Sequence, residues 1–319
     1  MMTPDSRDML RPPSRPPAGG PGTSMNSLVS ATRLPAVLLR YRELLGAFVR
    51  RELKARIEGS ILGRVWPVLQ PAVLFTIYYM IFVKVLKVPL GDGLAPRGED
   101  AVSHGWRATF YLITGILPWT VLAESLSRGA GVVLENANLI KKIAFPSELL
   151  PIYQVVVYHV YFLVGFMLLI GIEGTVNGAL PAALLWFPLV LAVQMAFIAG
   201  LAMILSAANV FVRDVMQAVP MLLTLWMFTT PVFYDVAALR GGSGQVLAEG
   251  GLDLTEVAYV AMAYNPMAIL LGMYRSMFSY GTIPFPLMAL VKMTAVAAVT
   301  LWLGYAYFLR SKGRFADEV

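Results

Sequence analysis

The sequence predicts an all-α integral membrane protein with six transmembrane helices, an amphipathic interfacial helix before the first span, and short re-entrant helices before the last. Three observations predict this fold class. Of the 319 residues, 58% are hydrophobic and only 14% are charged, whereas soluble domains carry about 25% charged residues. The mean hydropathy is +0.68. Apolar runs along the chain are close to the ~20 residues that a helix needs to cross a bilayer.

Residues 1–35 differ in composition from the rest of the chain. They are rich in Pro, Gly, Ser and Arg, as in RPPSRPPAGGPG, and they lack the apolar core of a cleavable signal peptide. Such a segment buries too little apolar surface to offset the entropy lost on ordering. We therefore expect a disordered cytoplasmic tail.

Residues 36–61 form the predicted interfacial helix. One face would be apolar, because apolar side chains recur every four residues at Tyr41, Leu45, Val49, Leu53 and Ile57. Basic side chains crowd the remaining surface. Such a helix lies in the headgroup plane with its cations on anionic lipid, here through Arg50, Arg51, Lys54 and Arg56. The alternative is an ordinary amphipathic helix packed on protein.

Six apolar segments within residues 62–309 have the length and composition of transmembrane spans. Most of the 25 Lys and Arg residues lie before residue 62, between the second and third spans, and after residue 309. Cytoplasmic segments are enriched in these residues, so both termini, including the tail 310–319, are predicted to be cytoplasmic. The net charge of +6 is therefore assigned to topology and not to nucleic-acid binding. The predicted spans are 62–86, 108–132, 149–171, 181–209, 216–235 and 285–309.

The segment between the fifth and sixth spans contains short apolar stretches interrupted by Gly and Pro. Residues 252–263 and the stretch MAILLGMYRSMF, which follows Asn265 and Pro266, would each form a short helix. Apolar helices too short to cross the bilayer are expected to be re-entrant or interfacial. We predict two half-crossing helices on the outer side.

The sequence lacks the signatures of catalytic and nucleotide-binding sites. There is no cysteine, and the two histidines, His104 and His159, do not have metal-binding spacing. His159 lies within a predicted span, where we expect a packed, hydrogen-bonded side chain. No GxxxxGK[ST] phosphate loop occurs, so the chain does not bind ATP by that route. We predict that the chain is not an enzyme and has no cofactor of its own.

Glu124 and Arg128 form a predicted buried charge pair within the membrane. They stand four residues apart in the second span and therefore share one helical face. Charges inside a span are costly and are usually paired and directed towards protein or water. Two interpretations stay open: a polar latch that passes motion to a channel, or a static pair that holds neighbouring helices together.

Aromatic side chains form one stripe on the first span and another on the fifth. Sugar rings present C–H faces that stack on aromatic rings, so stripes of this kind suit a glycan, and their assignment as a channel lining rests on the family resemblance given below. The alternative is ordinary helix packing, or the enrichment of aromatic residues at membrane interfaces. The candidate residues are Phe75, Tyr78, Tyr79, Phe82, Trp226, Phe233 and Tyr234.

A polar elbow joins the second and third spans. It is too polar for the hydrocarbon core, but its apolar residues allow it to dock on protein. We predict that a cytoplasmic partner contacts this elbow at Glu135, Asn136, Asn138, Leu139, Lys141, Lys142 and Phe145.

Four motifs of this chain resemble one transporter family. The central two are LPWTVLAESLSRG (117–129) and ENANLIKKIAFPSELLPI (135–152), and the flanking two are RELKARIEGSILGRVWPVLQP (51–71) and YNPM (264–267). They resemble the transmembrane permease subunit of ABC-2-type polysaccharide exporters, which serve O-antigen, capsule and teichoic acid.

The resemblance implies that a separate nucleotide-binding ATPase, which holds ATP and Mg²⁺, drives a homodimer of this chain. It further implies the cytoplasmic (inner) membrane, a polyprenyl-linked polysaccharide as substrate, a channel along the first and fifth spans, and a gate at the outer mouth. Two other functions stay open. One is ABC-2 export of a small lipophilic drug or antibiotic. The other is a membrane-embedded glycosyl- or acyltransferase, which would need clustered acids or histidines that the sequence does not show.

Overall fold

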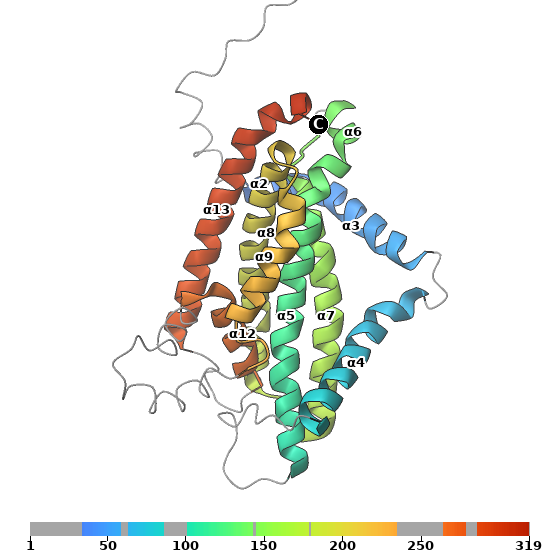
Figure 1. The fold of residues 1–319 in the computed structure, drawn as a ribbon, viewed down its shortest axis with the longest axis vertical. Coiled ribbons are helices and arrows are strands. Elements are labelled where there is room, and N and C mark those ends of the chain that lie inside the picture. Colours follow the sequence, from blue (N-terminus) through green and yellow to red (C-terminus); the bar gives the residue numbers. More distant parts are fainter. Residues whose placement is uncertain are drawn as a thin grey trace, which may run out of the picture.

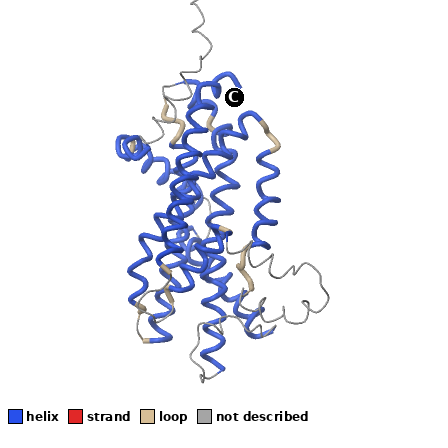
Figure 2. Tube along the Cα trace, turned by 90° about the vertical axis from the view of Figure 1, so that its left-hand side faces the viewer, coloured by secondary structure: helices blue, strands red, loops and turns tan. Residues whose placement is uncertain are grey.

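The computed structural model describes residues 34–58, 63–85, 101–142, 145–178, 180–234, 264–278 and 286–318. All regular elements in these residues are helical, as predicted (Figures 1 and 2). The α-helices are α2 (Leu34–Arg40), α3 (Arg42–Ile57), α4 (Trp66–Tyr78), α5 (Ala101–Glu135), α6 (Ala137–Lys142), α7 (Leu149–Asn177), α8 (Phe187–Phe211), α9 (Val215–Thr229), α12 (Pro266–Ser276) and α13 (Leu287–Glu318). The 3₁₀ turns η3 (Gly63–Val65) and η6 (Ala182–Trp186) precede α4 and α8, and the π-helix η4 (Tyr79–Val85) continues α4.

Four of the six predicted spans are helices long and apolar enough to cross a membrane. They are Ala108–Glu135, Leu149–Thr175, Ala182–Phe211 and Leu287–Phe315. The predicted spans 62–86 and 216–235 coincide with shorter apolar helices, Trp66–Ile81 and Val215–Thr229. Of the two predicted short helices before the last span, residues 252–263 lie outside the described residues, and the other is α12.

Prolines affect the backbone of both shorter helices. Pro71 lies inside α4, where it removes a backbone hydrogen bond. The residue before a proline is driven out of the helical region, and Thr230, which precedes Pro231, has φ −104° and ψ 133°. Helix α9 therefore ends at Thr229, earlier than the sequence analysis predicts.

Helix α5 lies at the centre of the bundle and contacts α4, α7, α8, α9 and α12. Its core positions Leu112, Leu122 and Ala130 are fully buried. The outer helix α13 instead exposes apolar side chains such as Val291, Val299 and Leu303, as expected of a surface that faces lipid.

The elbow helix α6 and the C-terminal end of α13 lie at one end of the bundle, and α12 lies towards the other (Figure 1). Helix α3 projects obliquely from the bundle near the first end and contacts α7, where Phe48 stacks on Tyr153 with 5.4 Å between ring centroids. Within the predicted segment 36–61 the described residues are helical up to Ile57, with a break at Tyr41, and the interfacial position of this helix remains a prediction.

Candidate functional site

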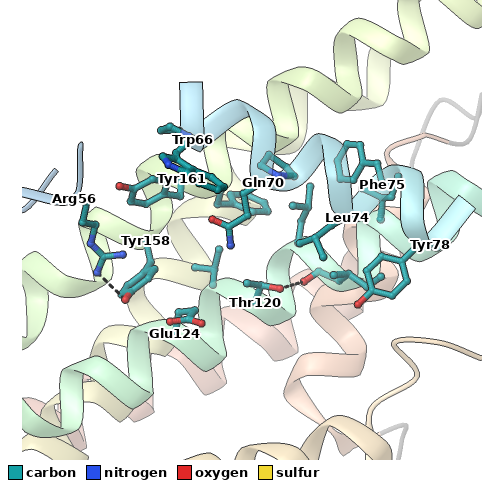
Figure 3. A pocket seen from close by; sticks show the side chains of 17 residues that line it. Arg56, Trp66, Gln70, Leu74, Phe75, Tyr78, Thr120, Glu124, Tyr158 and Tyr161 are labelled. Carbon is teal, nitrogen blue, oxygen red and sulfur yellow. Dashed lines mark hydrogen bonds between the residues drawn. The ribbon is translucent and has the colours of Figure 1, made fainter. Parts of the chain in front are cut away.

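A cleft of about 420 Å³ lies between the C-terminal end of α3 and helices α4, α5 and α7 (Figure 3). The charged side chains Arg56 and Glu124 lie towards one end, and the rings of Phe75 and Tyr78 lie towards the other (Figure 3). The cleft therefore combines aromatic surface with a polar end. Its labelled lining residues are Arg56, Trp66, Gln70, Leu74, Phe75, Tyr78, Thr120, Glu124, Tyr158 and Tyr161.

The floor of the cleft depends on a glycine of α7. A Cβ on Gly165 would lie 3.1 Å from Leu117 Cδ2 of α5 and 3.5 Å from Pro71 Cβ of α4. The absence of a side chain there allows the three helices to meet. Pro67 stands in the first turn of α4, where its missing N–H has no helical partner to lose, so α4 begins beside the cleft.

Arg56 is the best-anchored charge in the cleft. Its Nη2 donates a 2.7 Å hydrogen bond to the Tyr158 hydroxyl, and its Nε contacts Glu52 at 3.3 Å. The guanidinium carbon lies 4.6 Å from the Tyr158 ring centroid and 5.6 Å from that of Tyr161. Burial opposes the charge, but the hydrogen bond to Tyr158, the two phenols and Glu52 together raise the pKa of Arg56. Arg56 is therefore a fixed cation.

Arg56 was predicted to contact lipid headgroups alongside Arg50, Arg51 and Lys54. In the structure Arg56 is half-buried and also contacts α7 through Tyr158. The other three side chains remain exposed, and the contacts shown for them stay within α3 or its C-cap: Arg50 Nε donates to Gly46 O, Arg51 lies over Phe48, and Lys54 pairs with Glu58. Headgroup contacts of all four residues remain a prediction.

The predicted buried pair of Glu124 and Arg128 does not form. Both residues are exposed, and among the described residues no ion pair within 4.0 Å joins them. Glu124 lines the cleft, towards the same end as Arg56 (Figure 3). The latch role remains a prediction.

The predicted glycan-channel residues have three different surroundings. Phe75 and Tyr78 line the cleft, and Tyr78 packs on Phe233 at 6.0 Å between ring centroids, so the aromatic residues near α4 and those following α9 do meet. Tyr79 lines a second cavity of about 270 Å³. The side chain of Phe82 lies outside the described side chains.

Trp226 and Tyr234 make contacts that are typical of packed side chains. Trp226 lies edge-on to Trp119 at 5.9 Å, and its Nε1 donates to Asn265 Oδ1 at 3.1 Å. The Tyr234 hydroxyl donates to Phe228 O at 3.0 Å. Neither residue lines the cleft, and a channel role for the whole set remains a prediction.

Residues 43–247 of the chain match the ABC-2 type transporter family. The chain belongs to this family. The O-antigen export system permease protein RfbA of Myxococcus xanthus is 32% identical over 290 residues, which cover 90% of this chain and 99% of that protein. Two proteins of the same name from Klebsiella pneumoniae are 27% and 26% identical over 277 residues, 86% of this chain and 94% of each of them. The family resemblance of the four motifs is confirmed.

In this ABC-2 membrane subunit the elbow is a separate short helix. Asn136 lies between the end of α5 and the start of α6. Its Nδ2 donates to Val132 O at 2.8 Å and so satisfies a backbone carbonyl in the last turn of α5. Asn138 and Lys141 are exposed on α6, whereas Leu139 is half-buried. The remaining predicted contacts are Glu135, which is exposed, Lys142, whose side chain is outside the description, and Phe145.

Phe145 faces the protein. Its ring packs edge-on against Phe48 of α3 at 5.6 Å, and it also lines a cavity shared with Arg40 of α2 and Lys312 of α13. The elbow of this ABC-2 subunit therefore contacts α3, the helix whose C-terminal end borders the cleft. Its contact with a partner remains a prediction.

Sequence reasoning missed two groups of residues. Tyr158 and Tyr161 stand three apart on α7, a spacing that places them on one face, but the aromatic residues of the third span were not considered as cleft lining. The ion pair of Glu148 Oε2 and Lys312 Nζ, at 2.6 Å, joins residues far apart in the chain and has no local signal. His159 behaves as predicted: it is buried, and Nδ1 lies 2.7 Å from Val155 O.

Proposed function

We propose that this chain is the channel-forming permease subunit of an ATP-driven exporter of lipid-linked, O-antigen-like polysaccharide. The observation that carries the proposal is the similarity, over nearly the whole chain, to relatives named as O-antigen export permeases. ABC-2 permeases work with an ABC ATPase, and the sequence has no phosphate loop of its own. ATP and Mg²⁺ therefore belong to a separate partner subunit.

The proposed topology has six crossings in the cytoplasmic membrane. Four crossings are the long helices. The fifth is α4 with its extension η4, and the sixth is α9. Helix α12 is a half-crossing helix on the outer side. The elbow and the basic residues Lys312 and Arg314 of the C-terminal tail lie in the cytoplasm, as the enrichment of cytoplasmic segments in Lys and Arg favours.

The proposed assembly is a homodimer. Helix α9 exposes Met221, Leu225 and Phe228, and α4 exposes Val73 and Ile77. These apolar faces suit either lipid or a second copy of the chain. Closed two-fold assemblies are the commonest oligomers, and pairing α4 and α9 across the dimer axis would enclose a path for the polymer.

The cleft supports a role in loading the substrate. Its aromatic walls suit the C–H faces of sugar rings, and Gln70, Thr120 and Glu124 supply hydrogen-bonding groups for hydroxyls. Arg56 supplies a fixed cation at the end of α3, where the anionic phosphate of a lipid carrier would lie. In the proposed cycle, ATP binding closes the partner ATPases, the elbow moves, and α4 and α9 separate to admit the polymer.

The experiment is deletion of the gene and complementation with the full chain. We expect deletion to remove surface glycan while lipid-linked polymer accumulates inside the cell, and complementation to restore export only with an active ATPase partner. Unchanged surface glycan together with sensitivity to a lipophilic drug would contradict glycan export and favour drug export. Export with an inactive ATPase partner would contradict the ABC mechanism.

A further inference from the structure

The turn that follows α9 is held by the side chain of Asn265, a residue of the YNPM motif. Its Nδ2 donates to Thr230 Oγ1 at 2.8 Å and to Thr229 O at 3.3 Å. Its Oδ1 accepts from Trp226 Nε1 at 3.1 Å and from the N–H of Met267 at 3.0 Å, where it also caps α12. One buried amide thus joins the end of α9 to the start of α12.

Arg275, at the other end of α12, holds the next part of the same turn. Its Nη2 donates to Val232 O at 2.9 Å, and its Nε donates to Tyr111 O at 3.3 Å. The guanidinium carbon lies 3.6 Å from the centroid of the Tyr111 ring, and Arg275 is only 8% exposed. The Tyr111 hydroxyl in turn donates to Tyr234 O at 2.9 Å. Residues 230–234 are therefore fixed from both α12 and α5.

The fixed turn supports one end of the cleft. It carries Phe233, whose ring packs on Tyr78, and Tyr78 lines the cleft at the end away from Arg56 (Figure 3). A planar guanidinium with several donors holds two carbonyls in one geometry, which a lysine does not reproduce. The position of Phe233 therefore depends on Arg275, although Arg275 itself does not line the cleft.

We propose that Asn265 and Arg275 are positioning residues that fix the Tyr78–Phe233 contact and thereby set how wide an opening the glycan meets at this end of the cleft. The inference rests on the proposed function and extends it, because it assigns the width of the path to buried side chains that do not touch the polymer. Releasing Arg275 allows Phe233 and Tyr78 to separate.

The first test is chemical cross-linking in the assembled exporter. The natural chain has no cysteine, so the variant Tyr78→Cys/Phe233→Cys places one thiol pair in each copy of the chain, which a short bifunctional thiol reagent joins. Adding Arg275→Gln removes the charged donor, and we expect the cross-linking rate to fall roughly tenfold. Arg275→Lys retains the charge but not the planar set of N–H donors, and it should give an intermediate rate.

A matched control pair tests whether the change is local. Phe211→Cys/Phe315→Cys joins α8 to α13 at a site where the ring centroids are 6.3 Å apart. We expect Arg275→Gln to leave the cross-linking of this pair unchanged. Loss of cross-linking at both pairs would overturn the proposal, because Arg275 would then support the whole fold, and an unchanged Tyr78–Phe233 rate would overturn it as well.

The second test combines variants in a glycan export assay. If Arg275 acts through Phe233, Arg275→Gln should lower export no further once Phe233→Ala is present, because coupled residues are non-additive. Additive losses would contradict the positioning role. If the natural exporter moves no glycan at all, the proposed function fails, while the two cross-linking rates still decide whether Arg275 fixes the turn.

Discussion

Helices α8 and α13 pack backbone against backbone, whereas two cavities lie between α4 and the helices α5 and α7 that it contacts. A Cβ added to Gly200 or to Gly304 would overlap the backbone of the facing helix. The two cavities beneath α4, of about 420 and 270 Å³, are both lined by Phe75 and Ile113. Protein interiors are normally close-packed, so the two interfaces of this subunit are of different kinds.

We call the close-packed pair α8 and α13 the frame, and we call α4, which covers the two cavities, the wall. The α8–α13 pair keeps its geometry because any separation breaks many close contacts at once, as small residues at membrane helix interfaces allow. Helix α4 gives up few contacts when it moves, and segments of low contact density open at lower free energy. An exporter that must admit a polymer needs both kinds of interface, and the cleft lies at the loosely packed one.

The largest effect is expected from Gly304→Ala. The new Cβ would meet the backbone of Gly200, which cannot rotate away, so α8 and α13 must separate at a cost of about 3 kcal/mol or more in the free energy of unfolding. The control is Gly313→Ala on the same helix, which has nothing within 4 Å of the added Cβ. Denaturation of the purified subunit in detergent measures both. Equal free energies of unfolding for Gly304→Ala and Gly313→Ala would contradict the close packing of α8 on α13.

Arg56→Ala should have the next largest effect, on export rather than on folding. It removes the cation that the proposed function places at the carrier phosphate, where a charge-assisted hydrogen bond is worth about 1.5–3 kcal/mol, so export should fall at least roughly tenfold. Arg56→Lys should recover only part of the activity. Arg50→Ala on the exposed face of α3 is the control, because the hydrogen bond shown for it is to Gly46 O in its own helix. An export rate in Arg56→Ala equal to that in Arg50→Ala would place the substrate elsewhere.

The four long helices could be predicted from the sequence much more fully than α4 and α9. The long apolar runs that become α5, α7, α8 and α13 are set by hydropathy alone. Helix α9 is shorter than predicted because Pro231 acts on backbone geometry, which a hydropathy run does not register, and α4 continues past Pro71 and becomes a π-helix at Tyr79.

The candidate site was predicted only in part, because its members come from distant elements. Phe75 and Tyr78 were identified from their stripe, and Arg56 was identified as a functional cation but assigned to lipid. Its partner Tyr158 is 102 positions away in the chain, and no local pattern connects the two. The four-residue spacing of Glu124 and Arg128 allows a pair, but the open cleft beside Glu124 is a tertiary feature.

A smaller effect is expected at the end of the bundle that carries the elbow, where Glu148 and Lys312 join the residues after the elbow to α13. The Glu148 side chain is 8% exposed and that of Lys312 is 35% exposed, so the pair lies between the surface and buried cases. A double-mutant cycle with Glu148→Gln and Lys312→Met should give a coupling of about 1 kcal/mol in the free energy of unfolding. A coupling near zero would show that the elbow is not fastened to the frame.

The smallest effect is expected from Gly165→Ala, the same chemical change as Gly304→Ala made beneath α4. The added Cβ would lie 3.1 Å from Leu117 Cδ2, a terminal methyl group that borders the open cleft and has room to shift. Alanine also favours the helix by about 1 kcal/mol over glycine, so the free energy of unfolding should change by less than about 1 kcal/mol. If Gly165→Ala proves as destabilising as Gly304→Ala, α4 is held as rigidly as α13. The cleft would then be a fixed cavity, and admission of the polymer would require another helix to move.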